Sequence, residues 1–149
     1  MRVVVISGFF NPLHIGHIDY ISAARNLGDF LIVIVNSDKQ VGIKGSVPFM
    51  SQDDRLTIIR NIKGVDRAVI AIDEDGSVCQ TIREEFKRLQ NDPFFEDMVF
   101  ANGGDRKKGG VPEDVLEEEF GIKMIYNAGG EKTQSSSKLI KKAEVFSKN

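Results

Sequence analysis

Cysteine and long apolar runs are the scarce features of this sequence of 149 residues, and each shortage excludes a class of protein. Cys79 is the only cysteine, so the chain forms neither an intramolecular disulfide framework nor a metal cage of thiolates. No histidine lies near Cys79 in the sequence, and we therefore expect a buried packing residue rather than a nucleophile. No apolar run approaches the ~20 residues that span a bilayer, so no membrane partner is expected.

An excess of basic residues is lacking too. The 20 Lys and Arg residues are matched by 22 Asp and Glu residues, which gives a formal net charge of -2. Proteins that bind nucleic acid usually carry a broad basic surface that neutralises phosphates. No nucleic-acid partner is therefore expected, and any phosphate site must be local.

The chain has the length of one domain, and no repeat, low-complexity tract or interdomain linker divides it. Residues 1–149 are therefore expected to form a single domain. The first apolar stretch begins at residue 3, which leaves no room for a signal peptide, and we expect a cytoplasmic protein.

Short apolar stretches rich in β-branched residues alternate with stretches of helical spacing. The expected strands are residues 3–7, 30–36, 67–72, 98–101 and 123–126. The expected helices are residues 17–26, 51–62, 77–89, 113–120 and 136–146. This alternation predicts right-handed crossovers and a sheet covered on both faces. The fold class is thus α/β, a doubly wound parallel five-stranded sheet that binds ligands where its strands end.

The most informative stretch follows the first expected strand and reads Gly8-Phe9-Phe10-Asn11-Pro12-Leu13-His14-Ile15-Gly16-His17. Its two histidines are the only ones in the chain, and they lie three residues apart where a strand passes into a helix. A helix start offers unpaired N–H groups and the positive end of a dipole to an anion, and Gly16 allows a close approach. A histidine in such a place is often only a helix cap, but this pattern favours a triphosphate site.

This stretch resembles the GxFDxxHxGH signature of the HxGH nucleotidyltransferases, also called cytidylyltransferase-like proteins. The resemblance continues through residues 24–29 and the strand that ends in Asn36-Ser37-Asp38, and it spans nearly the whole chain. Within the family, the chain is most similar to the adenylyltransferase domain of ADP-heptose synthase, followed by glycerol-3-phosphate cytidylyltransferase. The resemblance implies a Rossmann-like nucleotidyltransferase fold and a homodimer.

The resemblance also implies a reaction, in which an acceptor phosphate attacks the α-phosphorus of a nucleoside triphosphate and releases pyrophosphate. Transfer of AMP from ATP to a phosphorylated small molecule such as a sugar phosphate is favoured. CMP transfer from CTP to glycerol 3-phosphate or a similar alcohol phosphate, and a non-catalytic nucleotide-binding module, are the alternatives. Because the nucleophile is already an anion, catalysis needs alignment and charge neutralisation. Mg²⁺ bound mainly through the triphosphate would contribute, and no metal site on the protein is expected.

The catalytic residues that the resemblance implies are His14, His17 and Lys44. The histidines would bind the triphosphate, and Lys44 matches the family's loop lysine, although an ordinary solvated lysine is the alternative. The expected nucleotide-binding residues are Gly8, Phe9, Phe10, Asn11, Gly16, Gly103, Gly104, Asp105, Ser135, Ser136 and Ser137. A Gly-Gly-Asp triplet is otherwise an ordinary turn, and serines at a helix start can cap the helix and bind phosphate together.

The acceptor is expected to contact Asn36, Asp38 and Arg55. Arg55 matches a family arginine that can reach a phosphate on the acceptor. An internal ion pair with Asp53 or Asp54 is the alternative.

Two departures from the family pattern bear on the substrate. Asn11 replaces the usual aspartate and removes one charge, and Asn11-Pro12 is similar to the GxFNPxHxGH form of relatives that adenylylate nicotinate or nicotinamide mononucleotide. The cytidylyltransferases also carry an RTEGIS-type segment before the last helix, where residues 130–135 contain no arginine. Lys132 lacks the planar fork of arginine, so this absence favours ATP over CTP.

Overall fold

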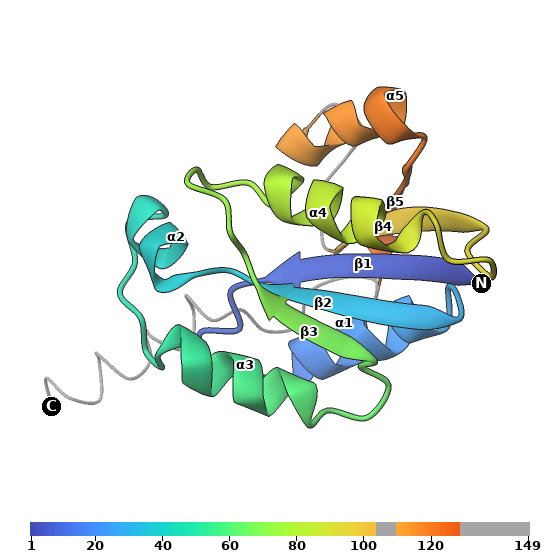
Figure 1. Cartoon of the computed structure of the whole chain (residues 1–149). Helices are drawn as coiled ribbons and strands as arrows, with labels where there is room; N and C mark the ends of the chain where they lie inside the picture. The colour runs from blue at the N-terminus through green and yellow to red at the C-terminus, as the bar shows by residue number, and fades with distance from the viewer. Residues whose placement is uncertain (104–109, 129–149) are drawn as a thin grey trace, which may run out of the picture.

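A parallel sheet with helices on both faces forms the body of the protein, as the computed structural model in Figure 1 shows for residues 1–103 and 110–128. In these residues the sheet has five strands, in the spatial order β3 (Arg67–Ile70), β2 (Phe30–Val35), β1 (Arg2–Gly8), β4 (Asp97–Gly103) and β5 (Lys123–Ala128). Every neighbouring pair is parallel. The predicted α/β fold class, a doubly wound parallel sheet, is confirmed.

The helices of the described chain follow the strands closely. They are α1 (Ile15–Arg25), α2 (Asp38–Ile43), α3 (Gln52–Arg60), α4 (Cys79–Leu89) and α5 (Val115–Phe120), with a 3₁₀ turn, η1 (Pro112–Asp114), before α5. Helices α4 and α5 cover one face of the sheet, and α1 and α3 cover the other (Figure 1).

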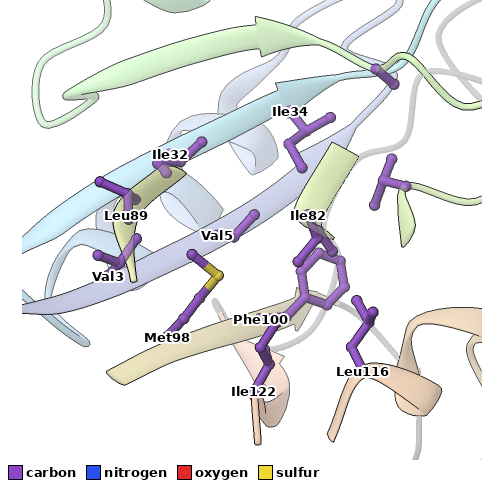
Figure 2. Close-up of a cluster of buried hydrophobic side chains, with 12 residues drawn as sticks. Val3, Val5, Ile32, Ile34, Ile82, Leu89, Met98, Phe100, Leu116 and Ile122 are labelled. Atoms are coloured by element: carbon purple, nitrogen blue, oxygen red, sulfur yellow. The ribbon is translucent and has the colours of Figure 1, made fainter. Parts of the chain in front are cut away.

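Alternate residues of the strands supply the two cores. Val3 and Val5 of β1 face α4 and α5, in a cluster that Figure 2 shows with Ile82 and Leu116. Val4 and Ile6 face α1 and α3. Because successive side chains of a strand point to opposite faces, an unbroken apolar run such as Val3–Ile6 fills both cores at once.

The strand order places the ligand crevice. From β1 the chain moves outward to β2 and β3, and then returns past β1 to form β4 and β5. The order therefore reverses between β1 and β4, and a sheet of this kind binds ligands outside the carboxyl ends of the strands at that reversal. The signature stretch of residues 8–17 follows the carboxyl end of β1 directly.

The structure corrects several predicted boundaries. Helix α1 begins at Ile15 rather than residue 17, because His14 caps it. Helix α4 begins at Cys79 rather than residue 77, and the expected helix 113–120 opens with η1. The prediction omitted α2, a six-residue helix capped by Ser37. The expected helix 136–146 lies outside the described residues.

Candidate functional site

The signature begins with a reversal of the chain after β1. Phe10 adopts a left-handed conformation with φ of 49°, and its ring folds back over Gly8. A Cβ atom on Gly8 would lie 2.7 Å from Cζ of Phe10, so only glycine leaves room for this ring. The Phe10 ring is 1% exposed and meets the ring of His17 edge to face, with centroids 5.0 Å apart. Gly8 thus leaves room for the Phe10 ring, and the Phe10 ring packs against His17.

The two histidines form a capping box at the start of α1. Nδ1 of His14 accepts the backbone N–H of Gly16 at 3.1 Å, and Nδ1 of His17 accepts the backbone N–H of His14 at 3.1 Å. Their rings stack with centroids 3.8 Å apart and planes inclined by 27°. Because a neutral imidazole has one donor and one acceptor nitrogen, an accepting Nδ1 leaves the proton on Nε2. In both neutral rings Nε2 is therefore the atom that carries the proton.

The same contacts correct one expectation about the helix start. The N–H of Gly16 is paired with His14, and the N–H of His17 donates to the His14 carbonyl oxygen at 3.0 Å. These two N–H groups are therefore not available to an anion. The expectation that these backbone N–H groups bind an anion is therefore wrong for Gly16 and His17.

Lys44 lies at the end of α2, and its side chain contacts Phe9 of the signature. Its Nζ atom is 4.4 Å above the centroid of the Phe9 ring, a cation–π geometry. The residue is the C-cap of α2, in the turn that follows the helix, and Gly45, with φ of 84°, comes next. The structure thus brings Lys44 and Phe9 together, although 34 residues separate them along the chain.

Arg55 is buried, which corrects its predicted contacts. Its side chain is 0% exposed, and its ion pair is with Asp38, at 2.7 Å between Nη2 and Oδ1, not with Asp53 or Asp54. Nη1 donates to the carbonyl oxygens of Phe9 and Asn36, each at 2.7 Å. A direct contact with an acceptor phosphate would require these bonds to break. Arg55 instead ties the signature, the end of β2 and the start of α2 to one another.

Gln40 is a site residue that the sequence reasoning missed. Its side chain is fully buried, and Nε2 donates to the carbonyl oxygens of Asp75 and Ser77 at 2.8 and 2.7 Å. Oε1 accepts from Nδ2 of Asn36 at 2.9 Å and from the backbone of Ser37 at 3.1 Å. The signal was present in the Ser-x-x-Gln spacing of residues 37–40, which is typical of a capping box.

Gly103 ends β4 beside α1. A Cβ atom there would lie 3.3 Å from the ring of Tyr20, whose hydroxyl donates to the carbonyl oxygen of Ala101. Close packing against this ring therefore accounts for a glycine at the end of the strand. Gly104, Asp105 and Ser135, Ser136 and Ser137 lie outside the described residues.

Residues 1–103 and 110–128 contain neither a metal-binding cluster nor a membrane-spanning helix. No group of three or more His, Cys, Asp or Glu side chains is arranged to hold a metal ion there. None of the helices in these ranges is long and apolar enough to cross a membrane. Cys79 is buried as expected, and burial raises the pKa of its thiol.

The comparisons with known proteins agree with the signature and the fold. The family model of cytidylyltransferase-like proteins matches residues 5–142. The chain belongs to this family. It is 34% identical over 146 residues to the Bifunctional protein HldE of Aliarcobacter butzleri, and this alignment covers 96% of the chain and 28% of that protein.

Two further relatives come from Thermoplasma volcanium. The chain is 36% identical over 81 residues to its FAD synthase, with 54% of the chain and 56% of the relative covered. It also superposes on the crystal structure of a lipopolysaccharide core biosynthesis protein with a TM-score of 0.64 and 26% identity, covering 85% of this chain and 96% of that one. The chain thus spans about a quarter of HldE and about half of FAD synthase.

Proposed function

We propose that this chain is a nucleotidyltransferase that moves a nucleoside monophosphate from a nucleoside triphosphate to a phosphorylated small molecule such as a sugar phosphate. AMP is favoured over CMP, and pyrophosphate is released. The observation that carries the proposal is the stacked pair of His14 and His17, both Nδ1 atoms of which face the backbone. Membership of the cytidylyltransferase-like family supports it.

The proposed reaction needs no covalent intermediate with the protein. An oxygen of the acceptor phosphate attacks the α-phosphorus, and the bond from that phosphorus to its bridging oxygen breaks, so that the electron pair leaves with pyrophosphate. Charge on the phosphate oxygens is offset by the Nε2–H donors of His14 and His17 and by the ammonium of Lys44. Mg²⁺, held mainly by the triphosphate, would supply further positive charge.

The strand order suggests how the two substrates share the site. The nucleotide would occupy the crevice between β1 and β4, contacting the signature, Gly103 and the predicted residues outside the described ranges. The acceptor would lie on the β2 side, where Asp38 is 38% exposed and is held by Arg55. Asn36 is 4% exposed, so in this proposal it acts through Gln40 and Arg55 rather than by direct contact.

The remaining parts of the proposal rest on the resemblance to the family and on the sequence. They are a single domain over residues 1–149, a homodimer and a cytoplasmic location.

The test is an assay of pyrophosphate release with ATP or CTP, Mg²⁺ and a panel of sugar phosphates, glycerol 3-phosphate and mononucleotides. We expect release that depends on one class of acceptor, is faster with ATP, and yields an adenylylated product detectable by mass spectrometry. Calorimetric binding of a triphosphate without release on any acceptor would favour the non-catalytic module. Faster release with CTP and glycerol 3-phosphate would favour the cytidylyl alternative.

A further inference from the structure

Asn11 joins the signature to the connection between α2 and α3. The residue is only 4% exposed. Its Oδ1 atom accepts hydrogen bonds from the backbone N–H groups of Phe49 and Met50, at 2.5 and 3.2 Å. Nδ2 donates to the carbonyl oxygen of Val47 at 2.9 Å. The orientation of the amide is determined by these neighbours, because the reverse orientation would place donors against donors.

The segment of residues 47–50 has little else to hold it. It lies in the connection between Ile43 and Gln52, which contains no helix or strand. The side chains of Val47 and Phe49 belong to residues that are 77% and 63% exposed, so apolar burial contributes little. Apart from the three bonds to Asn11, the described chain offers this segment one side-chain bond, from Nε of Arg55 to the Met50 carbonyl oxygen at 3.1 Å.

Asn11 stands between the two sides of the site. It precedes His14 by three residues, and the segment that it holds connects α2, which begins at Asp38, with α3, which carries Arg55. The three side-chain bonds leave one amide hydrogen of Asn11 for any other contact. Little of this side chain therefore remains for the direct contact with the nucleotide that we expected from the signature.

We propose that Asn11 is a positioning residue that fixes segment 47–50 on the acceptor side of the site, and that this task requires an amide. The proposal rests on the proposed function. An aspartate has the same shape and could still accept from Phe49 and Met50, but its carboxylate would face the carbonyl oxygen of Val47 with no hydrogen to donate. Segment 47–50 would then be repelled at one end, and the acceptor would lose part of its binding surface.

Three variants separate the parts of this argument. Asn11→Ala removes all three hydrogen bonds to segment 47–50, and Asn11→Asp removes only the one to Val47. Asn61→Ala removes a comparable asparagine bond, to the Thr57 carbonyl oxygen, at the exposed C-cap of α3. Hydrogen exchange of the Phe49 and Met50 amides, followed by NMR, should be about tenfold faster in Asn11→Ala. It should stay slow in Asn11→Asp and in Asn61→Ala.

Steady-state kinetics test the role in the reaction. In Asn11→Ala we expect KM for the acceptor to rise about tenfold at every pH, while the Kd of the triphosphate stays within about twofold. In Asn11→Asp we expect a smaller rise in the same KM, because the carboxylate still accepts from Phe49 and Met50 but has no hydrogen to donate to Val47. Asn61→Ala should match the wild type.

Contrary outcomes are distinct. Unchanged amide exchange in Asn11→Ala, or a loss of triphosphate affinity with the acceptor KM intact, overturns the positioning role. A different result would be faster exchange in Asn11→Ala together with a wild type that releases no pyrophosphate from any pair of substrates. That result overturns the proposed function, and with it any role of the Asn11 hydrogen bonds in catalysis.

Discussion

The imidazole of His14 caps the helix that presents it, and the imidazole of His17, stacked 3.8 Å away, closes the same capping box from inside the helix. Capping and phosphate binding use opposite nitrogens of each ring, since Nδ1 faces the backbone and Nε2 carries the proton. The structural and the functional interpretation of these histidines are therefore compatible. Capping and phosphate binding can also be tested separately, because an amide side chain can cap the helix without providing an imidazole.

His14→Asn and His17→Gln should remove the chemistry and keep the helix start. Asparagine is among the best N-caps, and glutamine at the third helical position completes a capping box. We expect turnover to fall about 100- to 1000-fold with the free energy of unfolding almost unchanged, as loss of a transition-state donor predicts. His14→Ala should additionally lose about 1 kcal/mol of stability in urea denaturation. Wild-type turnover in either amide variant would remove that imidazole from the mechanism.

Lys39 in α2 and Lys44 at the C-cap of the same helix offer a matched pair. Nζ of Lys44 lies over the Phe9 ring, whereas Lys39 pairs with the exposed carboxylate of Glu74. Lys44→Ala should lower kcat/KM about 100-fold, because a charge that offsets the triphosphate in the transition state is lost. Lys39→Ala should stay within about twofold of the wild type in the same pyrophosphate assay. Equal effects of the two substitutions would show that Lys44 acts only through general surface charge.

Sequence periodicity sufficed for the sheet because buried parallel strands leave unbroken apolar runs such as Val3–Ile6. It did not suffice for α2, whose six residues are too few for a periodic pattern and include Gly42. That helix is held by tertiary bonds, above all those of Gln40 to the carbonyl oxygens of Asp75 and Ser77. Such bonds join residues 35 or more positions apart, and no local pattern indicates them.

The site shows the same division. The signature indicated His14 and His17 through their spacing, which is a local property. The partner of Arg55 was misjudged because Asp53 and Asp54 are near in sequence, yet residues one or two apart on a helix do not face each other. The hydrogen bonds of Asn11 to segment 47–50 could not be predicted from the sequence, because they depend on where this segment lies in the folded chain. Local sequence patterns therefore indicated the candidate histidines, whereas the partners of Arg55 and Asn11 depend on contacts that only the folded chain makes.

Arg55→Met should destabilise the protein strongly. The substitution leaves the carbonyl oxygens of Phe9, Asn36 and Met50 without their buried donor, and it breaks the ion pair with Asp38. We expect a loss of about 2–4 kcal/mol in the free energy of unfolding, measured by urea denaturation. Arg60→Ala, at an exposed position in the last turn of the same helix, should change it by less than about 0.5 kcal/mol. A small loss in Arg55→Met would show that water replaces the guanidinium.

Glu85 should make stability depend on pH. Burial opposes ionisation of this carboxyl, but hydrogen bonds from Arg67 and Arg88 outweigh it and hold the pKa of Glu85 below its usual value. The unfolded chain, with an ordinary glutamate pKa of about 4.3, then takes up a proton before the folded chain does. The stabilisation is present above that pH and is lost as the pH falls through the lower pKa of the folded state. Urea denaturation between pH 7 and 3 should therefore show a steeper acid-side fall in stability for the wild type than for Glu85→Gln, which cannot titrate, and parallel curves would contradict the assignment.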